Sequence, residues 1–189
     1  MSYLRDDLPY LLKNSYKNQK EAAENLKKYG YTYDGALSNN ETKVFVKNNK
    51  PVIVHRGSKR LSDWAEDGLI LAGLGSMGHR QKQAERITKR VEEKYGSADA
   101  VGHSLGGRLA ENSKNHGQII TYNKAVGLGD IGKTKNSKRQ LDIRNSGDIV
   151  SVLGHTQKAN KEQLNKGLSF FNPIGAHNVN HLFGAHVEH

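Results

Sequence analysis

The chain has 189 residues, a formal net charge of +10 at neutral pH and no cysteine. Its length fits one ordinary domain, and the lack of cysteine excludes disulfides, thiol catalysis and cysteine-based zinc sites. No apolar run approaches the roughly 20 residues needed to cross a bilayer, so we expect no transmembrane segment.

The N-terminal part of the chain is predicted to be helical. Asp6 and Asp7 stand where a signal peptide would carry a basic segment, so we expect no secretory export. Residues 10–29 are rich in Lys, Glu, Gln and Ala and place apolar side chains at helical spacing. This pattern predicts one or two amphipathic helices, with Gly30 at their C-terminal end.

The next elements are two short β-prone runs, residues 42–46 and 51–55. Residues 47–50 between them have the composition of a hairpin loop, so we expect an antiparallel pair. The apolar segment 68–78 contains four glycines and is interpreted as a lid or acyl-chain wall, or equally as a buried strand or loop. Residues 81–95 then form the clearest helix, with apolar side chains on one face and Gly96 at its end.

Later in the chain a strand at residues 98–101 leads through a glycine-rich turn into a helix from residue 105 to about 115. Residues 118–122 and 141–144 are further strands. Strands that alternate with helices predict a single α/β domain over residues 1–189, with an N-terminal helical segment (1–40) and a tail (183–189) that frays. We expect a mostly parallel sheet with helices on both faces, an antiparallel hairpin at one edge, and a ligand site at the carboxyl ends of the strands.

Ser104 is the candidate nucleophile. It stands in Val101-Gly102-His103-Ser104-Leu105-Gly106-Gly107, where a strand meets a helix. A serine hydroxyl must project clear of its own backbone, and the sharp turn of G-x-S-x-G achieves this because its glycines leave room for the neighbouring chain segments. The five-residue pattern is weak by itself, but the strand before it and the helix after it favour the nucleophile over an ordinary glycine-rich turn.

The sequence resembles the class 3 lipase family of α/β-hydrolases. The resemblance rests on Gly-His-Ser-Leu-Gly-Gly and on Val52-Ile53-Val54-His55-Arg56-Gly57-Ser58, which is followed by Asp63-Trp64. With the acid and histidine considered next, it covers residues 42–182, while the N-terminal helices match the compact members of large DNA viruses. The resemblance implies an α/β-hydrolase fold and hydrolysis of lipid acyl esters.

The acid of a triad should lie in a loop beyond the end of a strand, which favours Asp148. The Asp-x-Val pattern of the resembled family also falls on Asp148. By alternation along its strand, Asp142 points out of the strand body and is interpreted as a solvated residue, and Asp130 as a charge in a basic loop.

The base should follow the acid along the chain, which leaves five histidines: His155, His177, His181, His186 and His189. The resemblance favours His177 and keeps His181 as its alternative. His155 is only seven residues beyond Asp148, and His186 and His189 lie in the terminal tail.

Two backbone donors are expected to hold the oxyanion. The Leu105 N–H follows the nucleophile and opens a helix, and the resemblance assigns the second donor to Ser58. His55 and His103 flank these positions and are interpreted as packed or hydrogen-bonded residues. No spacing of ligands indicates a metal, and no cofactor is expected.

The predicted function is that of a serine carboxylic-ester hydrolase, of lipase or phospholipase A type, with a lipid ester as substrate. An acyltransferase or thioesterase would use the same triad. The alternative is an inactive, basic protein of the same fold that binds membrane, nucleic acid or a partner in a virus particle. We expect a cytoplasmic or virion-associated protein, and the sequence indicates no oligomeric state.

The positive charge favours an anionic partner, either a phospholipid surface contacted peripherally or nucleic acid. The 29 Lys and Arg residues are scattered over helical and loop segments, so a merely solvated cationic surface is an equal alternative. No motif supports nucleic acid.

Overall fold

The computed structural model describes residues 2–58, 77–127, 138–145 and 161–165. The helices in these residues are α1 (Ser2–Ser15), α2 (Gln19–Lys27), the 3-10 helix η1 (Gly35–Leu37), α4 (Met77–Tyr95) and α5 (Leu105–Asn112). The strands are β1 (Thr32–Tyr33), β2 (Thr42–Lys47), β3 (Lys50–His55), β4 (Asp99–His103), β5 (Ile119–Tyr122), β6 (Gln140–Asn145) and β7 (Lys161–Asn165).

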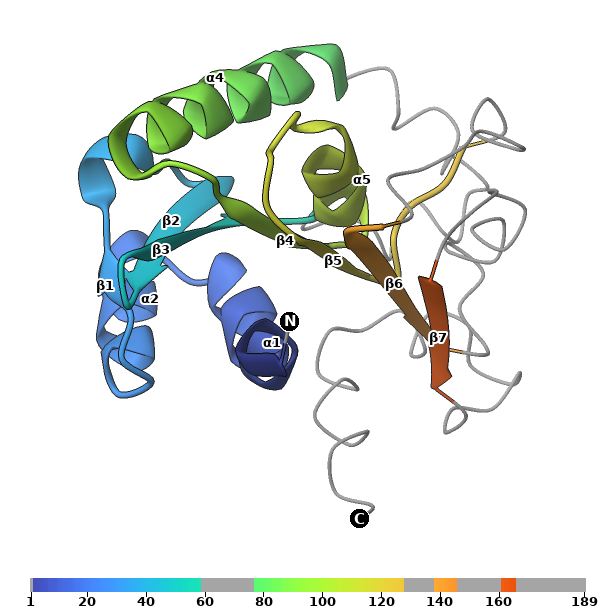
Figure 1. Ribbon diagram of the computed structural model, residues 1–189, viewed down its shortest axis with the longest axis horizontal. Coiled ribbons are helices and arrows are strands. Elements are labelled where there is room, and N and C mark those ends of the chain that lie inside the picture. Colours follow the sequence, from blue (N-terminus) through green and yellow to red (C-terminus); the bar gives the residue numbers. More distant parts are fainter. Residues whose placement is uncertain (1, 59–76, 128–137, 146–160, 166–189) are drawn as a thin grey trace.

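The described strands form one sheet of seven, in the order in which they follow one another along the chain (Figure 1). The pairs β1–β2 and β2–β3 are antiparallel, whereas each pair from β3 to β7 is parallel. The predicted fold class is therefore confirmed: the sheet is mostly parallel, of α/β-hydrolase type, with an antiparallel hairpin near one edge. The two-residue β1 lies outside this hairpin and was not expected from the sequence.

The hairpin of β2 and β3 owes its tight turn to two asparagines. The strands pair from Thr42 opposite His55 to Lys47 opposite Lys50. Asn48 and Asn49 between them have φ of 51° and 59°. Two successive residues with positive φ make the turn whose twist matches that of the strands, and asparagine tolerates this backbone region better than most residues.

Helices cover both faces of the sheet: α1 and α2 lie on one face, α4 and α5 on the other (Figure 1). Alternate residues of β3 show why both faces must be covered. Val52 and Val54 belong to a buried cluster with the leucines of α1, whereas Ile53 packs with Ile87 and Val91 of α4. The leucines buried on the α1 face are Leu4, Leu8, Leu11 and Leu12. Strands buried on both faces are typical of parallel sheets.

The ends of the helices differ slightly from the predicted ones. Helix α4 begins at Met77 instead of residue 81, and α5 ends at Asn112 because Lys114 turns the chain with φ of 61°. Strand β7 lies in a part of the chain where the sequence mixes helix-prone and irregular segments, and no strand was expected there. None of the described helices is both long and apolar enough to cross a bilayer.

Candidate active site

Ser104 joins β4 to α5 at the carboxyl end of β4, as predicted. Its backbone has φ 56° and ψ −124°, a combination that residues other than glycine rarely adopt. Strand β5 and the residues after it hold this conformation from both sides. The Ser104 N–H donates to the Tyr122 carbonyl at 3.0 Å, and the Ser104 carbonyl accepts from the Ala125 N–H at 3.1 Å.

The glycines that flank Ser104 are required by close backbone contacts. A Cβ on Gly102 would lie 2.1 Å from the Gly106 carbonyl oxygen, and a Cβ on Gly106 would lie 2.1 Å from the His55 carbonyl oxygen. Non-bonded atoms do not approach each other so closely, so any side chain at either position would push α5 away from the sheet. The turn is therefore built for the direct approach of α5 to β3 and β4, which an ordinary glycine-rich turn would not need.

Ser58 follows β3 on the same edge of the sheet as Ser104. His55, the last residue of β3, pairs with Gly102 of β4, so both strands end side by side. A Cβ on Gly57 would lie 3.2 Å from the Ser104 Cβ. The residue that precedes Ser58 is thus in contact with the nucleophile turn. Ser58 itself is half-buried.

Leu105 is the first residue of α5 and is buried. Helix geometry leaves its backbone N–H without an intrahelical partner, and the positive end of the helix dipole lies there. The predicted oxyanion donors are therefore placed around Ser104, one at the start of α5 and one after β3. Their roles remain predictions.

A cluster of charged residues fixes the segment that follows β3. The Arg80 guanidinium donates to the Arg56 carbonyl at 2.7 Å and pairs with Glu41 at 3.1 Å. Arg56 also faces Glu41, at 3.7 Å, and its N–H donates to the Glu41 carbonyl at 2.8 Å. Helix α4 and the residue before β2 thus hold Arg56, which directly precedes Gly57.

The two histidines beside the candidate residues are hydrogen-bonded, which confirms the prediction for both. His55 is fully buried, and its Nδ1 lies 3.0 Å from the Thr42 hydroxyl. Burial, together with the charge of Arg80, lowers the pKa of His55 to about 3. The Nδ1 of His103 lies 2.7 Å from the hydroxyl of Tyr16.

The Ser104 side chain is buried, and its Oγ makes no hydrogen bond with any described residue. The predicted acid Asp148 and the predicted base His177, with its alternative His181, lie outside the described residues. His155 and Asp130 also lie outside the described residues, as do residues 68–76 of the predicted lid segment. The last two residues of that segment, 77 and 78, begin α4.

Asp142 was expected to be a solvated strand residue, and this expectation is wrong. Its carboxylate is buried and accepts hydrogen bonds from Thr121 at 2.7 Å, Lys124 at 2.8 Å and Gln140 at 2.9 Å. Lys124 also pairs with Glu111 of α5. The face on which Asp142 points out of the strand is covered by α5, so a side chain there meets a helix instead of water.

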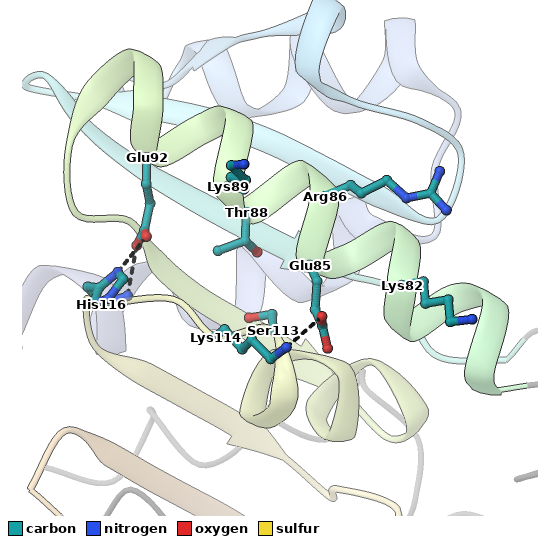
Figure 2. A pocket seen from close by; sticks show the side chains of 9 residues that line it. All are labelled: Lys82, Glu85, Arg86, Thr88, Lys89, Glu92, Ser113, Lys114 and His116. Atoms are coloured by element: carbon teal, nitrogen blue, oxygen red, sulfur yellow. Dashed lines mark hydrogen bonds and ion pairs between the residues drawn. The ribbon is translucent and has the colours of Figure 1, made fainter.

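A cavity of about 500 Å³ lies between α4 and the segment that follows α5 (Figure 2). Two polar contacts span it, an ion pair of Lys114 with Glu85 at 2.9 Å and a hydrogen bond between His116 Nδ1 and Glu92 at 2.6 Å. Since Ser104 precedes α5 and Lys114 follows it, the cavity lies at the far end of that helix from the nucleophile turn. It is therefore separate from the candidate active site.

Sequence reasoning missed Tyr16, which contacts the nucleophile turn from the N-terminal part of the chain. Nothing in the residues around it distinguishes it from a helix residue, so only the fold brings it to His103. Among the described residues no group of three or more His, Asp or Glu is arranged to hold a metal ion.

Comparison with known proteins identifies the family of the chain. Residues 9–162 match the family model of a phospholipase-like domain described as a Tle-like phospholipase domain. The matched part includes Ser58, Ser104 and Asp148 and ends before His177. A search of curated proteins finds no significant match. Because the family model spans most of the chain, the protein belongs to the family of Tle-like phospholipase domains.

Proposed function

We propose that the protein is a serine carboxylic-ester hydrolase of lipase or phospholipase A type, which acts on lipid acyl esters. The observation that carries the proposal is the strained backbone of Ser104 between β4 and α5. Strain of this kind at a serine is the signature of a nucleophile elbow, because it projects the hydroxyl away from the strand. The match to a phospholipase-like family supports a lipid substrate.

The proposed reaction passes through an acyl-enzyme. His177, oriented by Asp148, removes the proton of Ser104 as its Oγ attacks the ester carbonyl. The backbone N–H of Leu105 and the donor at Ser58 bind the oxyanion. His177 then protonates the departing alcohol, and a water molecule activated by the same histidine releases the fatty acid. The resemblance to class 3 lipases, and within them to the compact viral form, is part of this proposal.

The central test compares Ser104→Ala with wild type on p-nitrophenyl esters of increasing chain length. We expect kcat to fall at least about 1,000-fold, because removal of the nucleophile leaves only binding and the oxyanion hole. Ser113→Ala is the matched control, since Ser113 caps the other end of α5 and its hydroxyl donates to the Ala110 carbonyl. Equal rates for Ser104→Ala and wild type would instead favour the inactive, basic binding protein.

The histidine assignment has its own test. We expect His177→Ala to abolish hydrolysis and His181→Ala to retain most of it. Loss of activity only in His181→Ala would transfer the role of base to that residue. Fluorophosphonate labelling of Ser104 should fall in the same variant as hydrolysis, because attack on phosphorus needs the same base.

The substrate class can be read from the products. A phospholipase A releases a fatty acid and leaves the phosphate on the lysophospholipid. We expect this pair from phosphatidylglycerol vesicles treated with the wild type but not with Ser104→Ala. Hydrolysis of emulsified triacylglycerol alone would identify a neutral-lipid lipase.

A further inference from the structure

Helix α1 lies on the face of the sheet opposite α5 (Figure 1). Tyr16 directly follows α1, and its hydroxyl contacts His103 beside Ser104. The backbone just before it is firmly held. The Ser15 hydroxyl donates to the Leu12 carbonyl at 2.7 Å, and the buried ammonium of Lys43 in β2 donates to the Ser15 carbonyl at 2.7 Å. The start of the Tyr16 side chain is therefore fixed relative to the sheet.

The Tyr16 hydroxyl lies between the Ser104 turn and the residues that follow β3. It is 2.7 Å from His103 Nδ1, and the Gly57 backbone N–H donates a hydrogen bond to it. A Cβ on Gly57 would lie 2.5 Å from this hydroxyl, 2.9 Å from the His103 carbonyl oxygen and 3.2 Å from the Ser104 Cβ. The phenol thus touches both the residue before the nucleophile and the residue before Ser58.

We propose that Tyr16 is a positioning residue that ties the residues after β3 to the Ser104 turn and so sets the distance between the nucleophile and the second oxyanion donor. This role rests on the proposed function. One hydroxyl can serve both partners, since it accepts from the Gly57 N–H while it shares a second hydrogen bond with His103. Either tautomer of the His103 ring permits this bridge.

The Tyr16 hydroxyl keeps its proton over the range of pH in which a hydrolase works. Burial raises the pKa of the Tyr16 hydroxyl, so it stays protonated, although Arg56 and Arg80 nearby partly offset this effect. The ring of His103 is also fixed by packing. Its centroid lies 5.9 Å from that of Tyr16, edge to face, and 5.6 Å from that of Tyr122.

The consequence for catalysis follows from the sensitivity of rate to alignment. A misplacement of about 1 Å between reacting groups costs on the order of 100-fold in rate. Loss of the hydroxyl leaves the Gly57 N–H and His103 Nδ1 without this partner and frees the two segments from each other. We therefore expect kcat to fall about 10- to 100-fold with little change in KM, since Tyr16 acts on alignment and not on substrate binding.

The test is Tyr16→Phe, which keeps the ring and removes only the hydroxyl. The matched control is Tyr31→Phe, which removes the hydroxyl that donates to Asp7 at 2.9 Å, in a contact between α1 and the segment before β1. Both variants are assayed on a soluble p-nitrophenyl ester below their Tm, with kcat normalised by fluorophosphonate titration so that only folded molecules count. We expect the fall in kcat in Tyr16→Phe alone.

Two results would overturn the role of Tyr16 while leaving the proposed function intact. One is a wild-type kcat in Tyr16→Phe, and the other is an equal fall in both variants, which would mean that any lost hydroxyl near α1 has this effect. A wild type without Ser104-dependent turnover would contradict the proposed function itself. The three outcomes are distinguished in the same set of assays.

Discussion

At the scale of single residues, the Ser104 turn tolerates no added atom where α5 crosses the ends of β3 and β4. Gly106 lies directly against the His55 carbonyl, whereas Gly78, near the start of α4, has no atom of the described residues beyond its own neighbours and helix backbone within 4 Å of the place where its Cβ would stand. Two glycines in helices of the same protein thus have opposite surroundings. Alanine substitutions at the two positions can therefore serve as controls for each other.

We predict that Gly106→Ala lowers the free energy of unfolding by about 3 kcal/mol or more, because the methyl group meets backbone that cannot move independently of the sheet. Gly78→Ala should be neutral or stabilise by up to about 1 kcal/mol, since alanine is the better helix former. Urea unfolding followed by circular dichroism measures both. Equal stabilities for the two variants would show that α5 can shift away from β3 at little cost.

His55 gives a prediction about pH. Its pKa is about 3 in the folded protein, against an ordinary value near 6.5. Below pH 6.5 the unfolded chain takes up a proton at this residue and the folded chain does not, so stability is lost as the pH falls toward 3. Relative to His55→Gln, the wild type should lose about 2 kcal/mol between pH 7 and pH 5, measured by urea unfolding. Parallel pH profiles would contradict this assignment.

At the scale of elements, buried charges connect α5 to β5 and β6. Lys124 is 4% exposed and pairs with carboxylates of both Glu111 and Asp142. The pKa of Lys124 is raised, because the two carboxylates outweigh the effect of burial. The next residue, Ala125, donates its N–H to the Ser104 carbonyl. The ion cluster thus anchors the segment that holds the nucleophile turn.

We predict that Lys124→Met costs about 3 to 5 kcal/mol of stability, because it leaves the buried carboxylate of Asp142 and the partly buried carboxylate of Glu111 without their cation. Lys114→Met removes an ion pair of the same α5 region, but the Lys114 side chain is largely exposed, so the loss should stay below about 1 kcal/mol. Thermal unfolding distinguishes the two variants. A Lys124→Met variant as stable as Lys114→Met would mean that water reaches the cluster.

The strands and turns that could be predicted carry their signal in neighbouring residues. Residues 52–54 are β-branched and apolar, and the Ser104 turn has its glycines two positions away on either side. Strand β7 has a single apolar residue, Leu164, and forms because β6 offers it a partner. Asp142 was misjudged for a similar reason: the lysine, threonine and glutamine around it belong to a network that alternation along one strand cannot show. Tyr16 could not be identified from the sequence, because its hydrogen-bond partner His103 is 87 positions away.

At the scale of the whole molecule, the net charge of +10 has no role in the proposed catalytic steps. A hydrolase of membrane lipids gains from attraction to an anionic surface, which each Lys or Arg near the bilayer strengthens by about 1 kcal/mol. This attraction acts through solvent and is therefore screened by salt.

We predict that the protein binds phosphatidylglycerol vesicles at least about tenfold more weakly when salt is raised from about 0.05 to 0.5 M, since the Debye length becomes shorter than the distance between most charges and the surface. Sedimentation with phosphatidylcholine vesicles is the control and should show weak binding that salt does not change. Equal binding to both kinds of vesicle would contradict electrostatic docking, and tighter binding to DNA in a gel-shift assay would favour nucleic acid as the partner.

The strand order described above has a consequence for how the protein is made. Each described strand pairs with the strand synthesised just before it, so none has to enter between two that are already joined. The sheet can grow strand by strand as the polypeptide leaves the ribosome. The backbone hydrogen bonds that fix Ser104 are made with Tyr122 and Ala125, which are translated after Ser104. In a nascent chain, β1 to β4 are therefore made before the residues that hold the Ser104 backbone in its final conformation.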